Sequence, residues 1–477
     1  MSERIKKILK ASLFVRLINA VAGFLERQWD RSYSALIIAG AREKSGEPSV
    51  FNKLEGALNG AWRGFFRVLR LDRVFEGSIF TRTFFWTALC ALIAPLAPTT
   101  VTLLAALAAA FSLLVCLGRG ELRLRYMPIN KWIYGYALVY LVCTLTSVNP
   151  SSNLKGGALS LVFILFPIVL VNAVRDRKRA DTLTNILVIS GFLVAAYGIS
   201  QLLRGATSTT KWIDEAFNDN ISLRVYSTLD NPNVLSEYLL LVIPLGVALT
   251  LTGRNVNARI AAGAATLVMI AAMVFTYSRG GWLGLIFAAV VFLVIMDVRF
   301  IPIGLIAAAV LFFFLPETIL SRFASIGNLS DTSTNYRMSI WIGTVAMLKD
   351  YWLTGVGTGI EAFRNIYPVY SQHSALAQHS HSLYLQILAE MGVAGGAVFL
   401  GVICCTVRQC ASRIRRGCDR PLKTRLAAVL AGLAGFMLQS ATDYSFYNYR
   451  VMLVFWIFVG LGAVYAGLKE NEEAVSE

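Results

Sequence analysis

Arginine and histidine side chains are the residues of this chain best suited to binding an anion and moving a proton. Arg279 lies between two strongly apolar runs, residues 260–277 and 282–296. A cation in such a place is costly unless it meets water or an anion; an arginine that extends to lipid phosphate is the alternative. A guanidinium group presents a fixed fork of donors that suits a diphosphate, and the adjacent glycines let the backbone approach such a ligand. We therefore interpret Arg279 as an anion-binding residue.

Arg337 is the second candidate for binding an anion. It lies in a polar stretch, residues 330–339, that continues as an amphipathic helix through Trp341 and Leu348. The alternative is an ion pair at the end of this helix, with Asp331 as the partner. The residues alone leave both interpretations open.

The three histidines, His373, His379 and His381, all lie close together in the chain. His379 and His381 are two residues apart, so on one helix their rings would face different sides. A metal site would need further ligands, and carboxylates are sparse nearby, so we expect no bound metal. A neutral imidazole just before the predicted helix 382–390 suits a general base, with a purely structural role as the alternative.

The glycine-rich run Gly355-Val356-Gly357-Thr358-Gly359 has a superficial likeness to a dinucleotide-binding loop. It lacks the strand–turn–helix context and the full spacing of such loops. We therefore predict no nucleotide site there.

Composition identifies the elements that must position these residues. The 477 residues are 56% hydrophobic and 15% charged, with a mean hydropathy of +0.61, whereas soluble domains carry about 25% charged residues. Apolar runs of about 16 to 22 residues predict an all-α polytopic membrane protein, because helices satisfy their own backbone in lipid. About twelve spans are predicted, at residues 83–98, 99–117, 131–147, 158–174, 182–203, 233–252, 258–277, 281–298, 300–316, 393–410, 425–442 and 451–468.

Charge orients these spans. Cytoplasmic loops of membrane proteins collect Lys and Arg, and the basic clusters at 175–179 and 413–425 fall on the same side as the basic N-terminal region. Both termini are therefore expected in the cytoplasm, and segments 204–232, 278–281, 317–392 and 443–450 outside. This distribution accounts for the net charge of +16 without a nucleic-acid partner. The seven cysteines lie in predicted spans or cytoplasmic segments, so no disulfide is expected.

Residues 1–82 form a basic region ahead of the first span. Apolar positions between Ile5 and Leu25 recur at helical spacing, with lysines and Arg16 on the other faces. This pattern predicts a helix in the membrane interface that binds anionic lipid, and the segment from Trp62 to Phe75 resembles it. Binding to a calmodulin-like or other partner is the alternative. Residues 469–477 are an acidic cytoplasmic tail.

Several short motifs together resemble the O-antigen ligase and polymerase family. They are Asp230-Asn231-Pro232-Asn233, Ser278-Arg279-Gly280, Arg337 ahead of Ile340-Trp341, Leu353-Thr354-Gly355-Val356-Gly357, His381-Ser382-Leu383-Tyr384-Leu385-Gln386 and Glu390-Met391-Gly392-Val393-Ala394-Gly395. The resemblance covers residues 83–468, with its specific part from Arg224 to Gly395, and segment 317–392 as the external catalytic loop.

This resemblance implies a metal-independent membrane glycosyltransferase at the outer face of the bacterial cytoplasmic membrane. Its donor would be a glycan on undecaprenyl diphosphate and its acceptor a glycan or lipid, with no cofactor. Arg279 and Arg337 would hold the diphosphate, His381 would assist the acceptor hydroxyl, and Arg224 and His379 would also contact substrate. Ligase and polymerase activities are not separated. A solute transporter, such as for bicarbonate, or a peptidoglycan-type polymerase with a catalytic carboxylate are the alternatives.

Overall fold

The computed structural model describes residues 50–205, 224–299, 301–302, 317–324, 332–372 and 377–468, and within these ranges the regular elements are all helices. Up to residue 205 they are α4 (Val50–Val68), α5 (Leu71–Val74), η1 (Ile79–Thr81), α6 (Thr83–Ile93), α7 (Thr99–Arg119), α8 (Asn130–Leu145), α9 (Pro150–Ala173) and α10 (Arg177–Leu203). From residue 224 they are η3 (Ser227–Leu229), α11 (Pro232–Thr252), α12 (Val256–Val274), α13 (Arg279–Met296), α15 (Glu317–Ala324), α16 (Thr332–Tyr351), α17 (Ile360–Ile366), η4 (Tyr367–Tyr370), α18 (Leu383–Arg416), α19 (Arg420–Gln439), η5 (Ser445–Tyr447) and α20 (Tyr449–Ala466).

Nine helices of the described ranges are long and apolar enough to cross a membrane. They are α7, α9, α10, α11, α12, α13, α18, α19 and α20, which confirms the predicted all-α polytopic membrane protein. The predicted spans 83–98 and 131–147 correspond to shorter helices, α6 with 11 residues and α8 with 16. Pro95 and Pro98 follow the end of α6 and disfavour its continuation. The predicted span 300–316 lies mostly outside the described residues.

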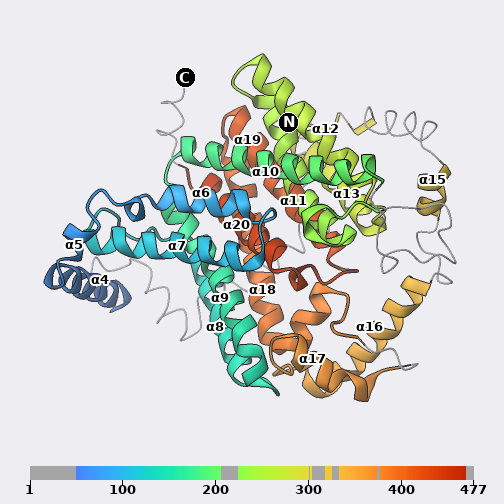
Figure 1. Ribbon diagram of the computed structural model, residues 1–477, viewed down its shortest axis with the longest axis horizontal. Coiled ribbons are helices and arrows are strands. Elements are labelled where there is room, and N and C mark those ends of the chain that lie inside the picture. Colours follow the sequence, from blue (N-terminus) through green and yellow to red (C-terminus); the bar gives the residue numbers. More distant parts are fainter. Residues whose placement is uncertain are drawn as a thin grey trace.

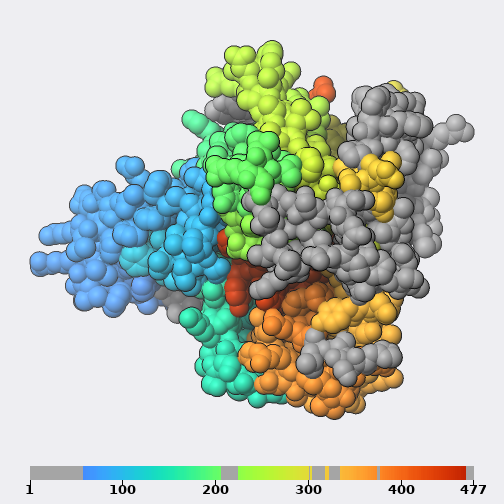
Figure 2. Space-filling model, turned by 45° about the vertical axis from the view of Figure 1, so that its right-hand side comes forward, coloured from blue at the N-terminus to red at the C-terminus, as the bar shows by residue number. Residues whose placement is uncertain are grey.

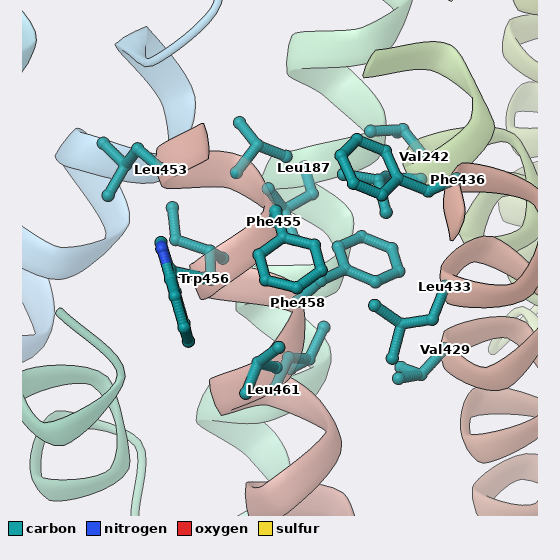
Figure 3. Close-up of a cluster of buried hydrophobic side chains, with 14 of the residues drawn as sticks. Leu187, Val242, Val429, Leu433, Phe436, Leu453, Phe455, Trp456, Phe458 and Leu461 are labelled. Atoms are coloured by element: carbon teal, nitrogen blue, oxygen red, sulfur yellow. The ribbon is translucent and has the colours of Figure 1, made fainter. Parts of the chain in front are cut away.

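Helix α20 lies at the centre of the bundle. Every side chain from Val451 to Tyr465 is buried, and the close-up in Figure 3 shows Phe455 and Phe458 packed among residues of α10, α11 and α19. Helices α12 and α13 are far less covered. Of the most apolar stretch of each helix, 22% of the residues are buried in α12 and 28% in α13, compared with 83% in α20. The hydrophobic faces that they leave exposed are those expected to meet lipid acyl chains.

The long polar segment forms a small folded unit of its own around α16 and α17. A second hydrophobic cluster joins these helices to the start of α18, with Ile340, Met347, Val356, Phe363, Tyr367 and Ala389 among its buried members. Helix α18 bends at Gly392, which has φ 59° and ψ −162°. The predicted helix 382–390 and the predicted span 393–410 are therefore the two parts of one bent helix, visible in orange in Figure 1.

The glycine-rich run packs against this bend. The N–H groups of Val356 and Gly357 donate to the carbonyls of Ala389 and Glu390, at 2.8 and 3.0 Å. A Cβ at Gly357 would overlap the Cα of Ser147, between α8 and α9. The glycines of this run thus allow close packing between the polar segment and the bundle.

Helices α4 to α7 project from one side of the molecule, in blue in Figures 1 and 2. Trp62 of α4 donates its indole N–H to the Leu114 carbonyl of α7 at 3.0 Å, and Phe66 is buried against Gly118. Other apolar side chains of this region, Phe65 and Val68, remain exposed. The predicted interfacial helix between Ile5 and Leu25 lies outside the described residues.

Candidate active site

A small polar pocket brings together the three arginines that the sequence predicted. Its volume is about 60 Å³. It is lined by Arg224, Asn233, Tyr277, Ser278, Arg279, Gly280, Arg337, Gln439, Thr442 and Asp443. These residues come from the segment before η3, from the starts of α11 and α13, from α16, and from the end of α19 and the segment that follows it. Elements far apart in the sequence therefore meet at one end of the bundle.

Arg279 is the first residue of α13 and is presented by a tight turn. Tyr277 has φ 51°, and the Ser278 hydroxyl caps the helix by accepting from Gly281 N–H at 3.3 Å. A Cβ at Gly280 would lie 3.3 Å from Gln439 and Thr442, and one at Gly281 would meet Ser236. These glycines therefore bring α13 close to α11 and α19, and Gly280 also lines the pocket. The N-terminal end of α13 adds a partial positive charge at the pocket.

Arg224 is buried and tied to both neighbouring turns. Its Nε donates to the Thr276 carbonyl at 2.9 Å and its Nη2 to Asn233 Oδ1 at 3.0 Å. Asn233 in turn donates from Nδ2 to Asp443 Oδ2 at 3.1 Å. Arg224 therefore contributes charge to the pocket and also holds its wall in place.

Asp443 is the residue through which the candidate side chains are connected. Its carboxylate lies 3.7 Å from Arg337 Nη2 and 3.8 Å from His381 Nδ1, in addition to the bond from Asn233. Burial by itself raises the pKa of Asp443, but the charge of Arg337 and the neighbouring His381 outweigh burial and hold this pKa well below its ordinary value. The group is therefore a carboxylate at neutral pH.

Arg337 reaches the pocket from α16. Its Nη1 donates to the Thr442 carbonyl at 2.9 Å while Nη2 faces Asp443. The ion-pair partner suggested by the sequence, Asp331, lies outside the described residues. The carboxylate that pairs with Arg337 here comes from the distant segment between α19 and α20.

His379 and His381 lie side by side, with ring centroids 4.2 Å apart. The divergence expected for two residues on one helix does not apply, because both residues precede α18, and His381 has a left-handed φ of 50°. His373 lies outside the described residues. Two histidines thus share one place in the site.

Their surroundings nevertheless differ. His379 packs against Tyr444 and Tyr447, and its Nδ1 accepts from the backbone N–H of His381 at 3.3 Å. Burial, with a contribution from His381, lowers the pKa of His379 to about 3. His381 faces Asp443 instead, and its carbonyl accepts from the Trp341 indole at 3.3 Å. A base of such low pKa is weak, so His381 is the better placed of the two to accept a proton.

Comparison with known families connects this geometry to a chemistry. Residues 264–400 match the family model described as O-antigen ligase. This segment is therefore similar to the O-antigen ligase domain. It contains Arg279, Arg337 and both described histidines, and it confirms the family resemblance found in the sequence. No curated protein matches the chain.

The match to O-antigen ligases supports polysaccharide transfer as the general activity of this multi-pass membrane protein, with lipid-linked glycan and acceptor as the general substrates. Arg224 and Asp443 lie outside the matched residues and complete the pocket from both sides. The sequence assigned Asp443 no role in this site. A single acidic residue after a span carries little signal, and only the fold places it against Arg337 and His381.

Proposed function

We propose that this protein transfers or polymerises a surface polysaccharide from an undecaprenyl-diphosphate-linked donor at the outer face of the bacterial cytoplasmic membrane. The observation that carries the proposal is a pocket in which Arg224, Arg279 and Arg337 meet one carboxylate, Asp443, next to His381. The excess of guanidinium groups favours a di-anionic group, and two adjoining phosphates are the part of the donor that such groups bind best.

The reaction is a displacement at the anomeric carbon of the donor sugar. The acceptor hydroxyl oxygen forms a bond to that carbon while the bond from the carbon to the diphosphate oxygen breaks. The electron pair leaves with undecaprenyl diphosphate, whose growing charge Arg279 and Arg337 stabilise. The hydroxyl proton passes to His381.

Asp443 positions both the proton acceptor His381 and the diphosphate-binding Arg337. It faces His381 through Oδ1 and Arg337 through Oδ2, so one carboxylate orients the base and one of the diphosphate ligands. A carboxylate beside an imidazole also stabilises the imidazolium that forms when the proton is accepted. The charges that this mechanism requires are all present in side chains, so we propose that the reaction needs no metal.

The charge distribution supports the proposed side of the membrane. With the basic clusters 175–179 and 413–425 in the cytoplasm, the pocket opens at the outer end of the bundle and both termini lie inside. The basic N-terminal region then faces the anionic inner leaflet. Arg63 and Arg67 of α4, beside exposed Phe65 and Val68, support such a lipid contact.

One observation favours a transporter as the second candidate. Glu237 of α11 is almost wholly buried, and its Oε2 has no hydrogen-bond partner within the described ranges. A carboxylate at such a place is typical of ion pathways. Substrate-driven flux in proteoliposomes without any glycan transfer would establish that function instead.

The deciding experiment is glycan transfer by the purified protein from a purified lipid-linked donor. Arg279→Ala and Arg337→Ala should each lower turnover by about 10²- to 10³-fold, the effect of removing one donor that stabilises a developing anion. Arg364→Ala is the matched control, because this exposed arginine of α17 pairs only with Glu361 among the contacts described for it. Full activity of both pocket variants would refute the proposal. Turnover should also be unchanged in the presence of EDTA. If EDTA abolished turnover and added zinc restored it, a metal would take part in the reaction.

A further inference from the structure

A second and larger pocket lies on the opposite side of the segment that carries Arg224. Its volume is about 550 Å³, within the range of about 300–1,000 Å³ typical of small-molecule sites, whereas the arginine-lined pocket measures about 60 Å³. Arg224 and Asn233 line the small pocket, while Tyr226 and Asp230, between them in the sequence, line the large one. Residues 224–233 are therefore a wall shared by the two pockets.

This shared wall is held rigidly from the side of the larger pocket. Gln201 Oε1 accepts from the Ser227 N–H at 2.9 Å, and the Ser227 hydroxyl donates to the Val194 carbonyl at 2.6 Å. Arg450 donates from Nη1 to the Thr228 carbonyl at 2.8 Å. The wall is thus fixed to α10 and to the start of α20 before any ligand is present.

The wall also contains strained backbone. Within the described ranges, five residues other than glycine have positive φ, and four of them are Ser227, Asp230, Tyr277 and His381. The first two line the larger pocket and the other two lie in the candidate active site. Such conformations are energetically costly and gather at functional sites. The larger pocket therefore shares this backbone feature with the candidate active site.

The lining of the larger pocket identifies the kind of ligand. Its two charged side chains, Asp230 and Arg450, form an ion pair at 3.1 Å, so the pocket offers no excess charge to a phosphate. Tyr197 and Tyr226 provide aromatic rings, and Thr99 and Thr228 provide hydroxyls. A sugar ring matches this lining, because its hydroxyls hydrogen-bond to polar groups while its C–H face packs on aromatic rings.

We propose that this pocket, lined by Tyr197, Tyr226, Thr99 and the Asp230–Arg450 pair, is a carbohydrate subsite that binds sugar rings next to the diphosphate pocket. The assignment rests on the proposed function, since a glycan transferase is what would need such a subsite. The donor glycan and the acceptor glycan present the same chemistry, and the experiment below separates them.

The test compares binding of the two parts of the donor to the full-length protein in nanodiscs. The probes are the free oligosaccharide released by mild acid from the lipid-linked glycan of the source cells, and undecaprenyl diphosphate without sugar. Tyr197→Leu and Tyr226→Leu should each weaken oligosaccharide binding by about tenfold and leave undecaprenyl diphosphate binding unchanged. Arg337→Ala should have the opposite pattern. Phe192→Leu, at an exposed aromatic residue of the same helix as Tyr197, should change neither.

Kinetics then identify the source of the sugar. A raised KM for the donor alone in the tyrosine variants assigns the pocket to the donor glycan, and a raised KM for the acceptor alone assigns it to the acceptor. The proposal is overturned if the unmodified protein does not bind the oligosaccharide, or if Tyr197→Leu behaves like Phe192→Leu. It also fails if both tyrosine variants lose undecaprenyl diphosphate binding. Oligosaccharide binding that depends on the tyrosines, without any transfer, would instead refute the proposed function and retain the subsite.

Discussion

Replacing Asp443 by asparagine should change donor affinity and turnover in opposite directions. The substitution would keep the shape of the side chain and remove the charge that faces Arg337 at 3.7 Å. At this distance and an effective dielectric constant of about 20, the attraction between the two charges is about 4 kcal/mol. If about a third of it becomes available to the donor diphosphate, undecaprenyl diphosphate should bind about tenfold more tightly.

Turnover should fall in the same variant. His381 loses the carboxylate that orients it and that stabilises its protonated form, and the contribution of a positioned base is about 10²- to 10⁴-fold. The assay measures undecaprenyl diphosphate binding and kcat on the same nanodisc preparation. Unchanged kcat, or weaker binding of undecaprenyl diphosphate, would refute the idea that Asp443 both competes for Arg337 and serves His381.

Asp181→Asn is the matched control for the loss of a paired carboxylate. Asp181 lies near the start of α10, away from the pocket, and accepts from Arg425 at 3.2 Å. Its substitution leaves a mostly buried arginine with less compensation, so it should lower stability. Donor binding and kcat of the folded protein should remain as they are.

Three further predictions follow from the same structure. His381→Ala should lower kcat by about 10²-fold or more with donor binding retained, whereas His379→Ala should change kcat only a few-fold; a larger loss for His379 would move the base to that residue. Burial lowers the pKa of His379 to about 3 from its ordinary 6.5. Between these two pH values the unfolded state therefore binds more protons than the folded state. The free energy of unfolding, measured by thermal denaturation, should therefore decline as pH falls below 6.5, by about 2 kcal/mol at pH 5. His379→Gln should make this free energy less dependent on pH. Gly357→Ala should destabilise the protein by about 2–4 kcal/mol, through backbone strain and overlap with Ser147, measured against Gly77→Ala, which has positive φ but nothing within 4 Å.

The parts of the site that could be predicted are those with a local signal. Arg279 was found because a cation between two apolar runs is costly and therefore rare, and Arg337 because it introduces an amphipathic helix in a long polar segment. The helical membrane class follows from the long apolar runs, since lipid permits few backbone arrangements. Each of these inferences uses only residues that are neighbours in the chain.

The remaining features depend on contacts between distant residues or on backbone angles. Asp443 has no distinctive neighbours in the sequence, and its partners Arg337 and His381 reach it only through folding. The two histidines lie in contact at a place where His381 has a positive φ, which residue type does not reveal. Helices α6 and α8 are shorter than the spans predicted over them, because hydropathy does not mark where a helix ends.

The bend of α18 limits how this site can change during evolution. Gly392 packs against the backbone of Leu353, and Val393 N–H donates to the Trp352 carbonyl at 2.8 Å, so the bend is fixed to the polar segment. Inserting or deleting one residue between His381 and this fixed point would turn the start of the helix by about 100° and carry the imidazole away from Asp443. Substitutions that adapt the protein to new glycans can therefore be tolerated during evolution. A change of chain length between His381 and the bend cannot, because it would separate the imidazole from Asp443.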